Sequence, residues 1–217
     1  GLVVAFATDD FSGVSGDIAG DSLSGGGTWT HSAHADFSDG ALQAQSGGIA
    51  PTTNGVDCVY YASPAPSSAD YEVQIDVAAV LGASISTRGL GVAGRVSTSA
   101  ATAYIFYADQ TGVYLYKAIA GVYTLLGSYS RAAANNTTET LKLSMLGSTI
   151  KGYVNGVERV SVTDSSITAA GKAGIYSFAA YTFNLASGWI GDNFSATDLT
   201  SASDAATATD AASVGVA

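Results

Sequence analysis

The chain has 217 residues, enough for one large β domain or two small ones, and a formal net charge of −10 with only 12% charged residues. An acidic chain with 8 Lys and Arg is a poor match for the phosphate backbone of nucleic acid, and it disfavours adsorption to anionic membranes. No apolar run approaches the roughly 18 residues of a membrane-spanning helix, so no membrane insertion is expected.

The first forty residues are rich in Gly and Ser and are predicted to wrap an edge or rim of the fold rather than to pair throughout. Both histidines, His31 and His34, fall in a polar, loop-like part of this stretch. Cys58 is the only cysteine, so an intrachain disulfide is excluded. We expect Cys58 to be a small buried residue, because a reactive thiol would need a base beside it.

Strict alternation of apolar and polar residues begins at residue 71. In "YEVQIDV", residues 71–77, every second side chain is apolar, and "LKLSM", residues 141–145, repeats the pattern. Such segments predict half-buried antiparallel strands. Aromatic and β-branched runs at 103–109, 112–118 and 122–130 read as a meander, with further strands around 89–97, 173–179 and 188–198.

No stretch of ten or more residues has a helical period, and we count 11 to 13 short strands. The sequence therefore predicts an all-β fold, a two-sheet antiparallel β-sandwich (jelly roll) with a low-complexity C-terminal extension.

The hairpin at residues 150–164 constrains the strand register. A plain two-residue loop at Asn155-Gly156 would place Lys151 on the face of Val160 and Val162. A three-residue loop with a glycine bulge at Gly156 instead puts Ile150, Gly152, Val160 and Val162 on one face. We predict this second arrangement, with a type I turn.

The chain changes character near its end. Residues 1–198 are assigned to the sandwich, and residues 199–217 to a tail rich in Ala, Ser, Thr and Asp, in which Asp198, Asp204 and Asp210 recur every six residues. A solvated linker is the simplest interpretation. The alternative is that the tail docks on a partner surface, and we predict self-association or binding to other assembly proteins through it.

Several segments resemble the concanavalin A-like lectin/glucanase jelly rolls, which include laminin-G-like modules. The resembling segments are "YEVQIDVAAV", "GVAGRVSTSAATAYIFYADQTGVYLYK", "LKLSMLGSTIKGYVNGVERVSVTD", "GKAGIYSFA" and "WIGDNFSATD". The opening "ATDDFSG" and closing "DNFSATD" also look like such domains in bacteriophage virion proteins. The resemblance implies a fold that hosts lectins, glycosidases, adhesion modules and viral appendage domains.

Catalysis finds little support in the sequence. Glucanases of this fold carry an E-x-D-x-x-E or E-x-D-x-E row on one strand, and the only glutamates here, Glu72, Glu139 and Glu158, lie far apart. Glu72 and Asp76 could share a sheet face, but no third carboxylate completes the row. No nucleophile elbow and no phosphate-binding glycine loop occurs. We therefore expect no enzymatic activity.

Calcium is the one metal that the composition favours, because Ca²⁺ takes oxygen ligands. Asp9, Asp10 and Asp192 could meet if the first and last strands are neighbours, and they form a candidate structural calcium site. Their alternative role is that of ordinary turn and strand-end residues. Asp109, and the pair Asp17 and Asp21, are weaker candidates.

Sugar binding needs exposed aromatic rings beside polar groups. The candidates are Tyr107, Tyr114, Tyr116, Trp29 and Trp189. Tyr114 and Tyr116 form the best pair, because they share a face opposite Val113 and Leu115. Each ring could instead belong to the core or to a plain sheet surface.

Two functions remain from this reading. The first is a non-catalytic structural or adhesive module of an extracellular assembly, in particular a phage virion appendage or decoration protein. The second is a carbohydrate-binding module of a secreted enzyme. Both place the chain outside the cell or on a virion.

Overall fold

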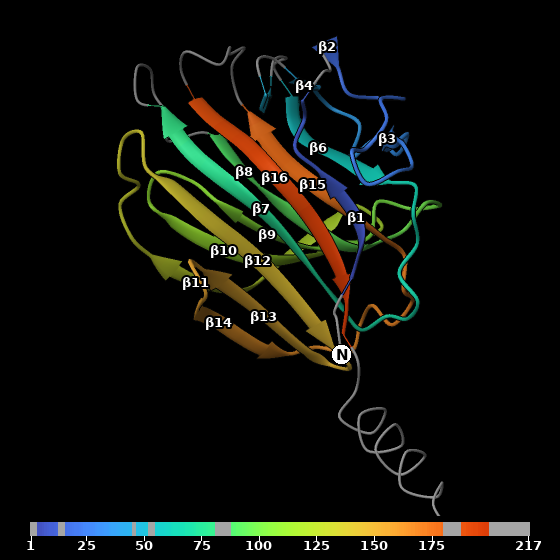
Figure 1. Cartoon of the computed structure of the whole chain (residues 1–217). Coiled ribbons are helices and arrows are strands. Elements are labelled where there is room, and N and C mark those ends of the chain that lie inside the picture. The colour runs from blue at the N-terminus through green and yellow to red at the C-terminus, as the bar shows by residue number, and fades with distance from the viewer. Residues whose placement is uncertain are drawn as a thin grey trace, which may run out of the picture.

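The computed structural model describes residues 4–12, 16–44, 47–51, 55–80, 88–179 and 188–199, and the regular structure in these ranges is all β-strand. The described residues form sixteen strands in two sheets, which pack face to face as a sandwich (Figure 1). The predicted all-β sandwich is confirmed. The strand count exceeds the expected 11 to 13 because short pairings occur in the glycine-rich N-terminal stretch. Residues 200–217 lie outside the described residues, so the predicted docking of the tail stays a prediction.

The nine-stranded sheet faces the viewer in Figure 1. Its strands run in the order β14 (Val157–Thr163), β13 (Thr149–Val154), β12 (Thr138–Leu146), β7 (Tyr71–Val80), β16 (Gly188–Asp198), β5 (Ile49–Pro51), β4 (Leu42–Ala44) and β2 (Gly16–Asp17). The first strand, β1 (Ala5–Asp9), also pairs with β16. The first and last strands are thus neighbours, as the sequence reading required for its candidate calcium site.

The seven-stranded sheet lies behind it. Its order is β11 (Val122–Ser130), β10 (Gly112–Ile119), β9 (Ala103–Ala108), β8 (Arg88–Val96), β15 (Lys172–Ala179), β6 (Gly55–Ala62) and β3 (Trp29–His31). The consecutive strands β9 to β11 form the predicted meander, and β8 pairs with β9 beside it. No helix in the described ranges is long and apolar enough to cross a membrane.

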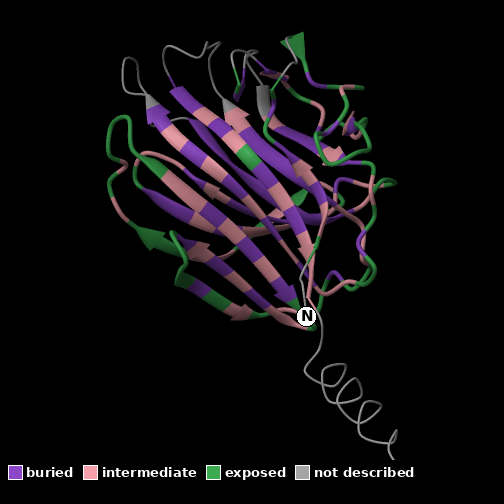
Figure 2. Ribbon diagram, viewed as in Figure 1, coloured by how far each residue is buried: buried purple, intermediate pink, exposed green. Residues whose placement is uncertain are grey.

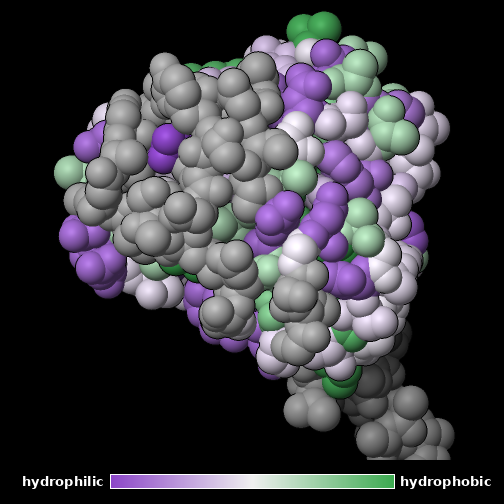
Figure 3. Space-filling view, turned by 90° about the horizontal axis from the view of Figure 1, so that it is seen from above, coloured by the Kyte–Doolittle hydropathy of each residue, from purple (hydrophilic) through white to green (hydrophobic). Residues whose placement is uncertain are grey.

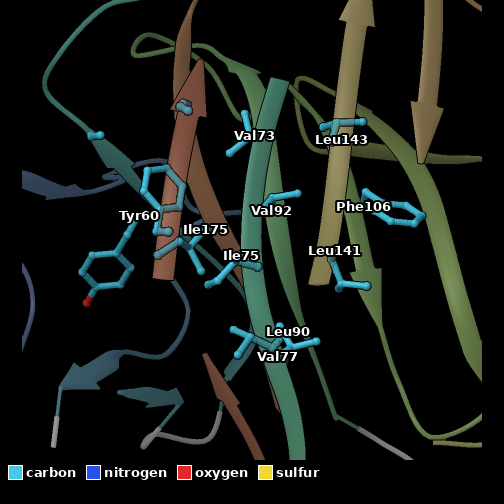
Figure 4. Close-up of a cluster of buried hydrophobic side chains, with 14 of the residues drawn as sticks. Tyr60, Val73, Ile75, Val77, Leu90, Val92, Phe106, Leu141, Leu143 and Ile175 are labelled. Carbon is cyan, nitrogen blue, oxygen red and sulfur yellow. The ribbon is translucent and has the colours of Figure 1, made fainter. Parts of the chain in front are cut away.

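The main core fills the space between the sheets. On β7 the predicted apolar face is buried at Tyr71, Val73, Ile75 and Val77, and Figure 2 shows the resulting alternation along the strands of the front sheet. Figure 4 shows side chains of β7 and β12 meeting those of the opposite sheet, including Phe106. Viewed from above, the described residues at one end of the sandwich carry a mixture of hydrophilic and hydrophobic side chains (Figure 3). Hydrophobic burial between the layers is therefore the principal source of stability.

The hairpin between β13 and β14 keeps the predicted register but not the predicted turn. Ile150 pairs with Val162 and Gly152 with Val160, as expected. The prediction of a three-residue loop was wrong: Asn155 and Gly156 both have positive φ, 50° and 76°, as in a two-residue type I′ turn. The extra residue is Arg159 of β14, which lies opposite the step from Gly152 to Tyr153 in β13, and this bulge restores the apolar face.

A second apolar cluster covers the outer face of the seven-stranded sheet. It contains Phe37, Val59, Ala93, Val96, Ala101, Ala103, Ile105, Ala118 and Tyr176. Phe37 comes from the segment after β3, and its carbonyl accepts a hydrogen bond from the Val59 N–H at 3.0 Å. Aromatic residues that are only partly buried pack against this cluster. This sheet is therefore apolar on both faces, and its outer face is where the candidate site lies.

Candidate functional site

The outer face of the seven-stranded sheet gathers tyrosines from neighbouring strands. Tyr114 of β10 pairs directly with Tyr107 of β9, and Tyr116 pairs with Ile105. Val113 and Leu115 point into the core, whereas Tyr114 and Tyr116 are only partly buried. The predicted division of β10 into a core face and a tyrosine face is confirmed.

Tyr107 is the centre of this aromatic group. Its ring stacks on Tyr114 at 5.4 Å and on Tyr116 at 6.0 Å between centroids, with interplanar angles of 27° and 18°. On its other side lie Tyr176 and Phe178 of β15, at 5.4 Å and 5.3 Å. Contacts of this kind are worth about 0.5–1.5 kcal/mol each beyond the area they bury, so the rings hold one another in place.

Glycines of β8 make room for the rings. A Cβ added to Gly89 would lie 2.5 Å from the Phe178 ring and 2.8 Å from the Tyr107 ring. A Cβ on Gly91 would lie 2.2 Å from the Phe106 carbonyl oxygen and 2.4 Å from the Tyr107 Cα. Because β8 lies between β9 and β15, bare backbone there lets aromatic side chains from both neighbours approach the sheet.

Next to these rings the face is hollowed into a pocket of about 210 Å³, which we call the aromatic pocket. It is lined by Asp57, Ile105, Tyr107, Tyr116, Tyr123, Tyr176 and Phe178. The volume lies below the roughly 300–1,000 Å³ of pockets for drug-sized ligands, so the aromatic pocket suits one small ring or substituent.

Asp57 of β6 is the carboxylate of the aromatic pocket. The Tyr176 hydroxyl donates a hydrogen bond to its Oδ1. Burial raises the pKa of Asp57, the hydrogen bond from Tyr176 opposes this rise, and the negative charges of Asp39 and Asp36 add to it. The Tyr123 hydroxyl donates to the Asp36 carbonyl oxygen at 2.9 Å. A partly buried carboxylate beside hydroxyl groups can both accept and relay hydrogen bonds to a polar ligand.

Both tryptophan candidates are corrected by the structure. Trp29 and Trp189 are each only 1% exposed, so neither ring is available as a stacking surface. Trp29 packs against Phe11 and Phe194, and its Nε1 donates to Asp9 Oδ2 at 2.6 Å. The Trp29 indole can lie in the core because its one polar atom, Nε1, has a buried hydrogen-bond partner.

The candidate calcium residues lie in one region without forming a cluster of ligands. Asp9 Oδ1 accepts hydrogen bonds from the Phe11 N–H and the Ser24 hydroxyl, at 3.0 and 3.1 Å. Burial raises the pKa of Asp192, and nearby Asp76, Asp10 and Asp9 raise it further. Within the described ranges, no three His, Cys, Asp or Glu side chains are arranged to hold a metal ion. Calcium at Asp9, Asp10 and Asp192 therefore stays a prediction.

The glutamates are engaged in ion pairs with three different partners. Glu72 pairs with Lys142 at 3.1 Å between Oε2 and Nζ, Glu158 with Lys151 at 2.8 Å, and Glu139 with Arg131. Asp76 accepts a hydrogen bond from the Thr140 hydroxyl at 2.6 Å.

One histidine, His31, lies in a strand and not in the loop predicted for it. His31 lies in β3, where its Nε2 is 3.6 Å from the Cys58 Sγ and its ring stacks on Tyr60 at 4.3 Å. Burial raises the pKa of the Cys58 thiol to about 12 and lowers that of His31. Cys58 is buried, as predicted, and its thiol stays protonated near neutral pH.

Sequence reasoning missed five lining residues of the aromatic pocket: Asp57, Ile105, Tyr123, Tyr176 and Phe178. A signal was present, because Tyr176 and Phe178 alternate with core residues in "AGIYSFA" as Tyr114 and Tyr116 do in "GVYLYKA". Their contact with Tyr107 depends on strand order. In sequence β15 follows β9 by more than sixty residues, but in the sheet only β8 lies between them.

A scan of protein-family models and a search of curated proteins both found no match to the chain. Solved structures do match. The carbohydrate-binding module CBM66 from Bacillus subtilis aligns with 78% of this chain and 95% of its own, with a TM-score of 0.63 and 17% identity. The fold is a concanavalin A-like jelly roll.

Two further structures support this assignment. One is described with the endo-acting O-glycanases that members of the human gut microbiota express to initiate mucin breakdown, and it aligns with 91% of this chain and 100% of its own at a TM-score of 0.61 and 9% identity. The β-glucanase of Bacillus licheniformis aligns with 92% of this chain and 99% of its own, with a TM-score of 0.51 and 13% identity. At these identities the likeness shows the fold alone. The expected virion context finds no support in these structures.

Proposed function

We propose that this concanavalin A-like domain is a non-catalytic glycan-binding module of a secreted or surface-exposed protein, and that the aromatic pocket is its binding site. The observation that carries the proposal is the convergence of five aromatic side chains and Asp57 on one outer sheet face. Sugar rings present apolar C–H faces that stack on aromatic rings, and hydroxyls that hydrogen-bond to carboxylates and tyrosine hydroxyls.

This proposal adopts the second of the two functions drawn from the sequence. The similar structures include a carbohydrate-binding module and a glucanase, which favours sugars over a virion role for this fold. An outer face rich in tyrosine, on a sheet whose inner face already supplies the core, also needs a reason beyond folding.

The non-catalytic part of the proposal is supported by the acidic side chains that the structure describes. Each glutamate is paired with a different basic residue, and Asp57 is the one carboxylate among the residues lining the aromatic pocket. Glycoside hydrolysis generally uses two carboxyl groups about 5 to 10 Å apart across the scissile bond.

Binding of oligosaccharides, screened on immobilised glycans and quantified by calorimetry, tests the proposal. Tyr116→Ala should weaken binding of the best ligand by about tenfold or more, because tyrosine is a frequent hot-spot residue and truncation of a hot spot costs about 2 kcal/mol or more. The matched control is Tyr153→Ala on the nine-stranded sheet, whose ring lies 4.9 Å from the Lys142 ammonium. Equal affinity of the two variants, or a folded wild type that binds no glycan, would reject the aromatic pocket as a sugar site.

A further inference from the structure

The aromatic pocket has the composition of a cation-binding cage. Rings of Tyr107, Tyr116, Tyr123, Tyr176 and Phe178 surround it, and Ile105 is the one aliphatic lining residue. The faces of such rings carry negative quadrupole potential, which attracts an organic ammonium group within about 6 Å of a ring centroid.

Carboxylates add to the negative potential. Asp57 lines the pocket, and Asp36 and Asp39 lie close enough to raise the pKa of Asp57 and of the Tyr123 hydroxyl. Asp36 is held against the turn after β10, where a Cβ on Gly121 would come within 2.1 Å of its Oδ2. Asp39 is tied to β6 through its N–H, which donates to the Asp57 carbonyl at 3.0 Å. Asp57 is thus the carboxylate inside the pocket, and the exposed Asp36 and Asp39 add negative charge beside it.

No basic side chain of the chain offsets this charge inside the pocket. All eight Lys and Arg fall within the described ranges, and none of them lines the aromatic pocket. Arg88 is buried in β8, and the others contact groups outside the pocket: Arg95 three backbone carbonyls, Lys117 Asp164, Arg131 Glu139, Lys142 Glu72, Lys151 Glu158, Lys172 the Ser63 carbonyl and Arg159 the Tyr129 ring.

We infer that the aromatic pocket recognises an organic ammonium group, and that its ligand is a glycan bearing an amino sugar with a free amine. The ammonium would lie among the rings with its charge facing Asp57, while the sugar ring stacks on an adjacent tyrosine. Recognition of an ammonium group is argued from the rings and carboxylates of the pocket. That this group belongs to a sugar rests on the proposed function. Anionic sugars such as uronic acids would be excluded, because a carboxylate there would meet Asp57 in the pocket and the negative charges of Asp36 and Asp39 near it.

Ligands that differ at one substituent test the inference. Nuclear magnetic resonance titrations at about pH 6, where a free amine is protonated, would compare glucosamine, N-acetylglucosamine and glucose. Choline chloride supplies the ammonium group without a sugar. We expect shifts centred on Tyr107 and Tyr116, and an affinity for glucosamine about tenfold above that for its N-acetylated form, falling as salt is raised.

The charge is tested separately from the shape. Asp57→Asn removes one negative charge but keeps an acceptor for the Tyr176 hydroxyl, so glucosamine and choline should each bind several-fold more weakly while glucose is little affected. Glu72→Gln on the other sheet removes the same charge far from the pocket, and it should leave all affinities unchanged. Loss in both variants would mean that net charge, rather than the cage, attracts the ammonium.

The possible failures are distinguishable. Sugars that bind at Tyr107 and Tyr116 with no preference for a free amine would overturn the inference and leave the proposed function standing. Choline that binds while none of the three sugars does would overturn the amino-sugar ligand, and the oligosaccharide screen then decides the proposed function separately. If neither choline nor any sugar perturbs the pocket, the cage is refuted as well.

Discussion

Gly91→Ala should damage both the stability of the domain and the shape of the aromatic pocket. The added Cβ would lie 2.2 Å from the Phe106 carbonyl oxygen, 2.4 Å from the Tyr107 Cα and 2.7 Å from its Cβ. Ordinary contacts of a Cβ begin at 3.4 Å, so the shortfall exceeds 1 Å. The atoms in the way belong largely to the backbone of β9, which is paired on both sides and cannot rotate away as a side chain could.

The expected magnitude follows from this geometry. Overpacking a well-packed interior costs typically 1–3 kcal/mol, and contact with backbone places this variant at about 3 kcal/mol. For a domain of 150–250 residues, each kcal/mol lowers the melting temperature by roughly 2–4 °C, so we expect a fall of about 6–12 °C. Displacement of Tyr107 should also weaken binding in the aromatic pocket.

Thermal unfolding followed by circular dichroism measures the effect. Gly147→Ala is the control, because its added Cβ has no neighbour within 4 Å and its cost comes from a φ of 57° alone. That left-handed conformation costs an alanine about 1–2 kcal/mol. A melting temperature for Gly91→Ala no lower than that of the control would refute the argument that bare backbone at β8 makes room for the rings.

Four further predictions are open to measurement. Gly156→Val should destabilise the domain by roughly 1 kcal/mol or more, since a β-branched residue resists the φ of 76° in the type I′ turn, and an unchanged denaturation midpoint would count against that turn. Burial raises the folded-state pKa of Asp57, so its contribution to stability is present below the unfolded value near 3.9 and is lost as pH rises through the folded value. Asp57→Asn should therefore melt above wild type at about pH 7, with the gap closing towards about pH 3, and a gap that is independent of pH would contradict this sign. If the three carboxylates predicted to bind calcium do so, a chelator should lower the melting temperature, whereas identical curves with chelator and with excess Ca²⁺ would eliminate that site. Deletion of residues 200–217 should leave the sandwich folded by circular dichroism and reduce any self-association seen by light scattering; equal scattering of both forms would show a passive tail.

The fold was largely predictable because its dominant signal is local. Alternation along β7 and β12 places each apolar side chain without knowledge of the partner strand, and the buried residues follow it. The turn at Asn155 was not predictable in the same way. Two loop lengths give the same register once a bulge is allowed, and the bulge formed at Arg159, within the strand, instead of at Gly156.

The candidate site was predictable only in its local part. The alternation of β10 was enough to expose Tyr114 and Tyr116, but Asp57 and Tyr176 join them through pairings between distant segments. The prediction that the tryptophans are exposed was wrong because it considered only their local sequence. A large aromatic residue in a loop-like segment looks available, and only the packing of Trp29 against Phe11 and Phe194 shows that it is not.

Side chains alternate between the two faces of the seven-stranded sheet, so core packing and the outer aromatic surface depend on different residues. Inward-pointing Val113 and Leu115 belong to the core of the sandwich, while outward-pointing Tyr114 and Tyr116 stack on Tyr107 at the outer face. On the proposed function, substitutions at the outer positions would alter ligand preference without repacking the interior, provided that the glycines of β8 are retained. The outer face thus offers a set of positions for directed evolution, in which a library of new specificities would be drawn from one unchanged scaffold.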